Sequence, residues 1–456
     1  MALRLFKNKK KVFVTISSIL LSVYLIVKYD CILMAKMYTK TTAERDLYEL
    51  SVLIGDSIPQ HFFNNKSLNN SLVRITKLSK LLSQFQIAKF NVMKPSLSLE
   101  LLRRKLLEEA KELDWFMKTE LQNSSINYKR ILSFSRSIIS KLSIDPFESW
   151  RRKEFESLSN FVQKTLQNLQ NPNNCSQAPK LLCKIRNCGL GCHIHAKAFC
   201  MMKAYEINRT LLMEETNCIM DMVKPITSKL CSISHFSNSD PKLVTIDLRR
   251  QDNLTPVAIP AHLQNKIRHI HDNPFLWWTS QVVKYVFRLR PSVLKRVQKI
   301  SDEHHPIAGV HVRRTDKLKS EAKFHDIEEY MAHVEEYFSH QKIESGTNLY
   351  QERHIFLASD DNHVLQDARK RYPEYTIWGY HIQQRQSHRR VACRQELKQL
   401  VDTLHQLSQT DYLVCTFSSN MCRLAFEMMT ALRLDAPQRF KSLDSLWYFD
   451  RQRPIF

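Results

Sequence analysis

The C-terminal half of this 456-residue chain alternates short apolar runs with helical patterns, and this alternation restricts the fold more than any other feature. The clearest strand is residues 307–313, because Val310 and Val312 point to one face while His311 and Arg313 point to the other. Similar patterns predict strands at residues 354–358, 375–378 and 412–417, and helices at residues 327–338, 364–372, 397–408 and 419–432. Strands that alternate with helices form a parallel, doubly wound sheet, so the predicted fold class is α/β.

Three polar loops fall at one edge of this predicted sheet. In doubly wound sheets, ligands bind beyond the carboxyl ends of the strands. That rule selects residues 313–321, 359–361 and 416–419, which all carry polar or charged side chains. Each loop alone is typical of an ordinary turn. Their common position at one edge is what predicts a site.

The chain before residue 301 is predicted to be helical, with a cysteine-rich part. Helical spacing near residues 102–117 and 150–169 predicts a stem over residues 31–170. The stem suits a spacer or a homodimer contact, and packing against the globular part is the alternative. Residues 171–300 are predicted to be the disulfide-rich and helical first part of a catalytic domain, and residues 301–456 its nucleotide-binding part. Within the first part, residues 175–231 are expected to form compact loops, and Trp277 and Trp278 to be core residues.

The cysteines indicate an oxidising compartment. Of eleven cysteines, five lie between Cys175 and Cys200. Zinc binding by Cys188, Cys192 and Cys200 with His193 or His195 is the alternative, but no CxxC pair occurs and the spacing fits no common zinc finger. Disulfides therefore explain this density better.

The N-terminus predicts a membrane anchor. A basic tail at residues 1–11 precedes an apolar segment, which we assign as the anchor at residues 12–30. Positive flanks stay cytoplasmic, so we expect a single-pass type II protein with its C-terminal bulk in the lumen. A cleaved signal peptide is the alternative, although no small-residue cleavage site follows the apolar run.

The net charge of +23 favours anionic partners such as nucleotide phosphates, polyanions or membrane. Nucleic-acid binding and a sulfotransferase-like activity are therefore the competing hypotheses. The predicted luminal topology argues against nucleic acid. The chain has six glycines and neither GxGxxG nor GxxxxGK[ST], which argues against folds with glycine-rich phosphate loops.

The stretch HVRRTDK, residues 311–317, carries the chemistry of the first polar loop. Arg313, Arg314 and Lys317 can clamp a diphosphate, and fixed cations stabilise a departing nucleotide without a metal. Glu321 is a candidate general base, although it also suits a solvated helix start. A surface ion pair with Asp316 is the alternative for the arginines.

Several longer stretches carry a family resemblance. Residues 309–338, with HVRRTDK and FHDIEEYMAHVEEYF, closely resemble the α1,6-fucosyltransferases that core-fucosylate N-glycans. So do LASDD at residues 357–361 and LVCTFSSNMCRLAFE at residues 413–427. Earlier matches are LRRKLLEEAKEL, LQNPNNCS, CGLGC and WWTSQVVKY. The sequence ends at Phe456, so the resemblance is to a divergent form without the family's C-terminal Src-homology-like barrel.

This resemblance implies a GT-B-like, Rossmann-type catalytic domain in the Golgi lumen. It also implies inverting, metal-independent transfer of L-fucose from GDP-β-L-fucose to the 6-hydroxyl of the innermost GlcNAc of N-glycans. The partners would be GDP-fucose and N-glycan acceptor glycoproteins, with no nucleic acid. The alternative is a non-catalytic homologue that binds GDP-fucose or glycan, or that partners an active fucosyltransferase.

The resemblance also assigns residue roles. Glu321 would be the base, Arg313 would hold the β-phosphate, and Lys317 would support that anion or the base. The implied donor-binding set is His311, Arg313, Arg314, Asp316, Ser419, Gly189, Gly191 and Asp402. Asp402 is included because the family's guanine-reading aspartate aligns with the adjacent Thr403. The implied acceptor-binding acids are Asp360, Asp361 and Asp247.

Two further points concern the cysteines and the acidic pair. The family pairing implies the disulfides Cys175–Cys231, Cys183–Cys200, Cys188–Cys192 and Cys415–Cys422. Asp360 and Asp361 could form a metal-binding carboxylate pair instead of a sugar-binding one. The arginine-rich loop makes a metal redundant, so we favour sugar binding and expect no metal.

Overall fold

The computed structural model describes residues 74, 77, 78, 81, 97–120, 128–145, 147–185, 188–213, 218–227, 231, 242–249, 259–271, 273–314, 323–345, 352–382 and 390–447. The predicted tail at residues 1–11 and anchor at residues 12–30 lie outside these ranges. Among the described residues, no helix combines the length and hydrophobicity needed to cross a membrane. The chain divides into two compact units, Met1–Pro146 with His340–Asn348, and Phe147–Ser339 with Leu349–Phe456.

The described part of the first unit includes the helices α4 (Leu97–Glu120) and α5 (Tyr128–Leu142). Their apolar faces pack together around Leu106, Leu113 and Ile139. Our sequence analysis predicted the first of these helices but not α5, whose sequence YKRILSFSRSIISKL is rich in serine and basic residues.

The second unit begins with a small parallel sheet where we expected compact loops. Its strands are β1 (Lys180–Lys184), β2 (Thr210–Met213) and β3 (Leu243–Asp247), in the order β2-β1-β3. The loop prediction was wrong because these strands have only four or five residues each, too few to show a strand pattern. The neighbouring helices are α6 (Glu148–Gln170), α7 (Leu190–Glu206), α8 (Ala261–Ile270), α9 (Pro274–Val286) and α10 (Pro291–Leu294), with a 3-10 turn at Cys218–Asp221.

Helix α6 belongs to this second unit. Phe155, Val162 and Leu166 are buried in the same core as the residues of α7 and α9. The second unit therefore begins at residue 147, whereas the predicted stem extends to residue 170. Trp277 and Trp278 of α9 are fully buried, which confirms that they are core residues.

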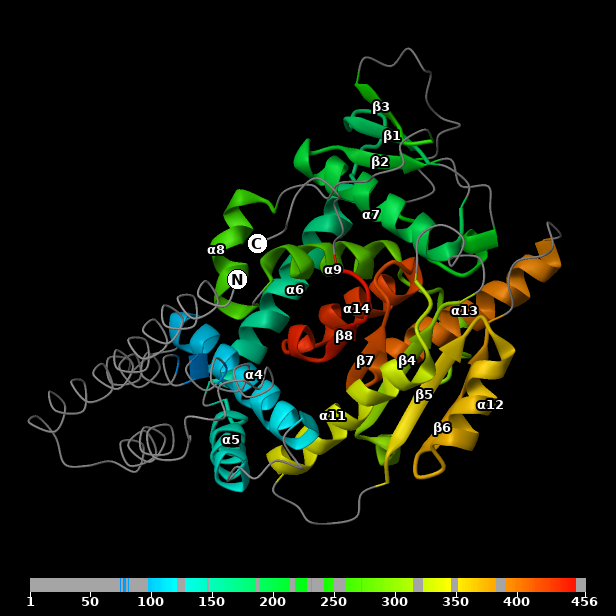
Figure 1. Ribbon diagram of the computed structural model, residues 1–456. Coiled ribbons are helices and arrows are strands. Elements are labelled where there is room, and N and C mark those ends of the chain that lie inside the picture. Colours follow the sequence, from blue (N-terminus) through cyan, green and yellow to red (C-terminus); the bar gives the residue numbers. More distant parts are fainter. Residues whose placement is uncertain are drawn as a thin grey trace, which may run out of the picture. The chain divides into compact units, whose positions relative to one another are not determined.

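A larger sheet forms the rest of the unit (Figure 1). Its five parallel strands have the order β6-β5-β4-β7-β8. They are β4 (Ile307–Val312), β5 (His354–Ser359), β6 (Thr376–His381), β7 (Tyr412–Cys415) and β8 (Phe440–Ser442). The connecting helices are α11 (Ile327–Ser345), α12 (Asn362–Arg371), α13 (Arg390–Gln409) and α14 (Asn420–Leu432), with 3-10 turns at Asp302–His304 and Ala436–Gln438. Every predicted strand and helix of this region is confirmed, and β8 is an addition.

Alternation along the strands divides the core into two layers. Ala308, Val310 and Val312 of β4 pack with α11 and α12 on one face of the sheet. Ile307 of β4 and Phe356 of β5 face the other layer, with α13 and α14. Because both faces are covered, the central strands β4 and β5 are buried throughout, as expected for a doubly wound sheet.

The structure contains the four disulfides that the family resemblance implies. The paired Cα atoms are 5.5 to 6.1 Å apart, in Cys175–Cys231, Cys183–Cys200, Cys188–Cys192 and Cys415–Cys422. Cys188, Cys192 and Cys200 are therefore bonded to other cysteines. This pairing removes the zinc site that the sequence left open.

Candidate active site

The candidate site lies where the strand order of the larger sheet reverses. Strand β4 pairs with β5 on one side and with β7 on the other, so the connections diverge beyond the carboxyl ends of β4 and β7. A ligand of a doubly wound sheet binds at this position. The segments that follow β4, β5 and β7 supply the predicted site residues, and Figure 1 shows the three strands side by side.

Arg313 and Asp360 form a charged pair at this edge. Nη1 of Arg313 lies 3.0 Å from Oδ2 of Asp360, and the aspartate side chain is only 1% exposed. The other oxygen, Oδ1, accepts the backbone N–H of Arg314 at 2.8 Å. The buried carboxylate therefore fixes both the side chain of one arginine and the backbone of the next, while Arg313 remains 20% exposed.

Arg314 is directed into the protein. Its Nη2 donates to the carbonyl oxygen of His325 at 3.1 Å, and its guanidinium lies over the Phe324 ring at 4.5 Å. Its Nη1 is 3.6 Å from Oδ2 of Asp361. These contacts hold residues 324–325 close to the carboxyl ends of β4 and β5. The donor-binding role of Arg314 stays a prediction. In the structure its guanidinium contacts His325, Phe324 and Asp361.

Asp361 is the N-cap residue of α12. Its Oδ1 accepts the backbone N–H of His363 at 3.0 Å, and its own N–H donates to Oγ of Ser359 at 3.1 Å. Both acids at the end of β5 are thus bonded to arginine or to backbone. Their acceptor-binding role stays a prediction. An arginine 3.0 Å from Asp360 disfavours the alternative of a metal-binding pair.

His311 lies within β4 and is buried close to the Arg313–Asp360 pair. Burial, and after it the neighbouring Arg313, lower the pKa of His311 to about 4, while Asp360 opposes this shift. The ring is therefore neutral near neutral pH. Its Nδ1 atom has no hydrogen-bond partner among the described residues. Contact with a guanine stays a prediction, since the side chain is covered in this structure.

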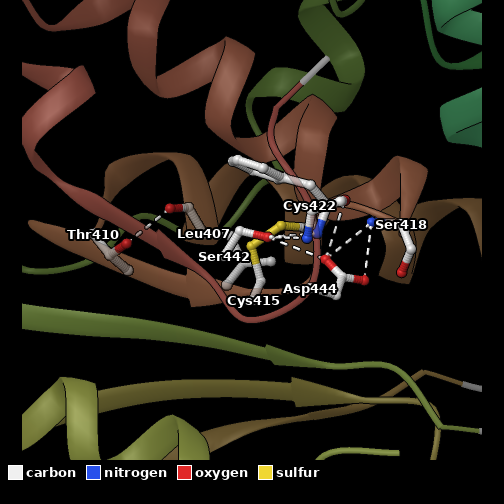
Figure 2. Close-up of a disulfide and its surroundings, with 9 residues drawn as sticks. Leu407, Thr410, Cys415, Ser418, Cys422, Ser442 and Asp444 are labelled. Atoms are coloured by element: carbon white, nitrogen blue, oxygen red, sulfur yellow. Dashed lines mark hydrogen bonds between the residues drawn. A yellow bond between two sulfur atoms is a disulfide. The ribbon is translucent and has the colours of Figure 1, made fainter. Parts of the chain in front are cut away.

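The loop after β7 is held in place from two directions. Figure 2 shows the disulfide between Cys415, at the end of β7, and Cys422, in the first turn of α14. The backbone N–H of Ser418 donates to the carboxylate of Asp444, at 3.3 and 3.4 Å from its two oxygens. Ser419 is the N-cap of α14, but its side chain makes no capping hydrogen bond. The loop is therefore rigid, and the Ser419 hydroxyl is not used by the helix.

Two helix N-termini meet beside this loop. A Cβ atom on Gly191, in the first turn of α7, would lie 2.8 to 3.0 Å from atoms of Asn420, the first residue of α14. Only glycine permits so close an approach. Gly189 is the N-cap of α7 and has open space around it, so a ligand can approach its backbone. Helix N-termini attract anions, and two of them converge here.

The remaining predicted residues are dispersed. Asp402 lies on α13, where partial burial raises its pKa, and the adjacent Thr403 side chain is fully buried. Asp247 is exposed at the end of β3, and Arg249 holds its pKa below the usual range. Asp316, Lys317 and Glu321 lie outside the described residues, so their roles stay predictions.

Sequence reasoning gave three residues at this edge no role in the site. Asn420 follows the two serines of the β7 loop and was passed over because a single asparagine has no distinctive pattern. Glu427 lies two turns further along α14, and His195, which the sequence offered only as a zinc ligand, bonds to both of them from α7. No spacing rule could have brought them together. Among the described residues, no group of three or more His, Cys, Asp or Glu side chains is arranged to hold a metal ion.

A parallel α/β sheet with a fixed arginine and two helix N-termini at its switch point is typical of proteins that bind phosphorylated ligands. The chain belongs to the alpha-(1,6)-fucosyltransferase family, because residues 48–448 match the family model described as alpha-(1,6)-fucosyltransferase N- and catalytic domains.

Named relatives agree with this assignment. The alpha-(1,6)-fucosyltransferase of Drosophila melanogaster is 34% identical over 403 residues, covering 78% of this chain and 64% of the relative. That of Caenorhabditis elegans is 29% identical over 333 residues, covering 67% and 59% respectively. The chain thus spans less than two thirds of either relative. The solved NodZ alpha-1,6-fucosyltransferase, soaked with GDP-fucose, has a TM-score of 0.35 and 12% identity, covering 55% of this chain and 92% of that one. That structural likeness is too weak to carry an argument.

Proposed function

We propose that this protein transfers L-fucose from GDP-β-L-fucose to the 6-hydroxyl of the innermost GlcNAc of N-glycans. The observation that supports this most is the fixed Arg313 at the switch point of the sheet, beside the converging N-termini of α7 and α14. Membership of the alpha-(1,6)-fucosyltransferase family supports the fucosyl donor and the linkage.

The proposed reaction is an in-line displacement at the anomeric carbon of fucose. The acceptor 6-hydroxyl attacks from the face opposite GDP, so the configuration inverts. Glu321 takes the hydroxyl proton as the new bond forms. The bond to the β-phosphate oxygen breaks, and negative charge develops on the departing GDP.

The groups at the sheet edge suit this developing charge. Arg313 offers a planar guanidinium whose position is fixed by Asp360, so little reorganisation is needed as the charge grows. The backbone N–H groups at the start of α14 and α7 add positive partial charges without any titratable proton. With these groups in place, transfer without a metal ion is the proposed mechanism.

We further propose a GT-B-like catalytic domain that faces the Golgi lumen behind an N-terminal type II anchor. The four disulfides support an oxidising compartment. A homodimer through the helical stem is part of the same proposal. N-glycan glycoproteins are the proposed acceptors.

The decisive experiment measures fucose transfer by the full chain to a GlcNAc-terminated biantennary glycopeptide, with GDP-fucose and excess EDTA. Glu321→Gln should abolish turnover while leaving GDP binding intact. Arg313→Lys should lower kcat/KM by about 100-fold or more, since lysine cannot reproduce a two-pronged contact with phosphate.

The matched control is Arg353→Lys. Arg353 pairs with Glu335 and precedes β5, at the opposite edge of the sheet, so this change should leave turnover nearly unaltered. A folded wild-type protein that binds GDP but gives no transfer would refute the proposed activity. It would favour the alternative of a non-catalytic homologue.

A further inference from the structure

A second polar cluster joins α7 to α14 next to the proposed donor site. Nδ1 of His195, on α7, lies 3.1 Å from Oδ1 of Asn420. Nε2 of the same ring lies 3.0 Å from Oε2 of Glu427. Both partners belong to α14, so one imidazole bridges two turns of the neighbouring helix.

Both atoms that face the ring are hydrogen-bond acceptors. Oδ1 of Asn420 also accepts a hydrogen bond from Arg423, which identifies it as the amide oxygen. The other carboxylate oxygen of Glu427 accepts the indole N–H of Trp447 at 3.1 Å. Each ring nitrogen of His195 therefore faces an oxygen of α14. Because the carboxylate of Glu427 is only 2% exposed, its oxygens depend on partners such as His195 and Trp447.

The contact between His195 and Asn420 lies one helical turn from Gly191, which also touches Asn420. Gly191 and His195 are four residues apart on α7, so they lie on one face of the helix. The backbone at Gly191 packs directly on Asn420, and the His195 ring bonds to its side chain. Two contacts of different kinds therefore fix the first residue of α14 against the first turns of α7.

We propose that His195 is a positioning residue of the donor site, which holds the N-terminus of α14 in register with the N-terminus of α7 through Asn420 and Glu427. This inference rests on the proposed function, in which both N-termini face the diphosphate of GDP-fucose. His195 itself does not contact the donor. It sets where the backbone donors of the β7 loop and of α14 point.

The energetics favour a positioning role over simple packing. A buried polar contact adds little net stability compared with well-packed apolar side chains of the same volume. What His195 supplies is a directional contact, since a ring with two hydrogen bonds to α14 permits one relative placement of the helices. A displacement of a fraction of an ångström at Asn420 would move the amides that follow Ser419.

The test uses His195→Gln in the full chain, with GDP as the probe because its binding needs no turnover. We expect about tenfold weaker GDP binding by calorimetry, the loss that follows when one charge-assisted hydrogen bond is removed. In transfer assays the KM for GDP-fucose should rise by a similar factor, while the KM for the acceptor stays unchanged. His262→Gln is the control, because the ring of that exposed histidine on α8 lies 3.2 Å from the Tyr205 hydroxyl of α7.

A second variant guards against misfolding. Glu427→Gln keeps the shape of the side chain and an acceptor for Trp447, but removes the charge that His195 faces. It should weaken GDP binding as His195→Gln does. The double variant should be no worse than either single one, because both remove the same contact. Thermal unfolding of each variant shows whether the protein that is assayed is folded.

The outcomes separate the two proposals. If folded His195→Gln and Glu427→Gln bind GDP as the wild type does, the positioning role is refuted while the proposed function stands. A wild type that binds no GDP refutes both. A wild type that binds GDP but does not transfer fucose refutes only the proposed activity, and the GDP affinities of the variants still decide the role of His195.

Discussion

The most informative substitution at the site is Asp360→Asn, because it distinguishes two roles for one residue. The family resemblance implies that Asp360 binds the acceptor sugar, whereas the structure uses its two oxygens to hold Arg313 and the backbone of Arg314. Asparagine has nearly the same shape. Its amide has one acceptor oxygen, so its NH₂ group must face one of the two donors.

The size of the effect follows from the burial of the pair. Removing one partner of a fully buried ion pair costs about 3–5 kcal/mol. Arg313 keeps 20% of its side-chain surface exposed, so water can solvate part of its charge and reduce this cost. We therefore expect the free energy of unfolding to fall by about 2–3 kcal/mol. If the same interaction orients Arg313 toward the donor, GDP affinity should fall by about 30- to 100-fold.

The assay combines urea unfolding, GDP calorimetry and transfer kinetics with both substrates varied. The positioning role predicts weaker GDP binding and an unchanged acceptor KM. Asp367→Asn, on the exposed face of α12, is the control for loss of a carboxylate and should alter neither value. A raised acceptor KM with intact GDP affinity would refute our reasoning and restore the sugar-binding role.

Three further predictions follow from the same geometry. Arg314→Lys should lower kcat about tenfold but leave GDP affinity unchanged, because its guanidinium bonds to the carbonyl of His325 and holds residues 324–325; calorimetry with GDP checks this. Replacing Cys415 and Cys422 by serine should lower the free energy of unfolding by about 2 kcal/mol, because the unfolded chain regains the entropy lost by closing a loop with a sequence separation of 7. Urea titration measures this change. The pKa of His311 is lowered from 6.5 to about 4, so the unfolded chain binds a proton first as the pH falls. The stabilisation that depends on the neutral His311 ring is therefore complete above pH 6.5, and the free energy of unfolding should fall by about 2 kcal/mol by about pH 5. His311→Gln should reduce this pH dependence in urea titrations.

The large sheet could be predicted because its signal is local. Strands β4, β5 and β7 are largely apolar runs buried on both faces, β6 is partly exposed, and each helix between them has an apolar side with helical spacing. The small sheet could not be predicted. Strands such as TLLM are too short to show a period, and their partners are set by contacts across loops that contain disulfides.

The site was predictable to the level of its loops but not of its bonds. The rule that ligands bind beyond the carboxyl ends of the strands placed Arg313 and Asp360 at one edge of the sheet. The two residues are tens of positions apart, so the sequence does not show that they form an ion pair. The same limit applies to His195, which is remote in sequence from Asn420. Opposite charges and neutral amides can each be satisfied by many partners, and only packing selects one.

The shared core of the two sheets has a consequence for how ligands are captured. Leu181 of the small sheet, Trp277 of α9, and Phe356 and Cys415 of the large sheet belong to one continuous cluster of buried side chains. A hinge motion that swung one sheet away from the other would have to open this cluster and expose it to water, at about 25 cal/mol for each Å² of apolar surface. The two halves are therefore expected to behave as one rigid body, and the described part of the proposed nucleotide site is already assembled before any ligand arrives.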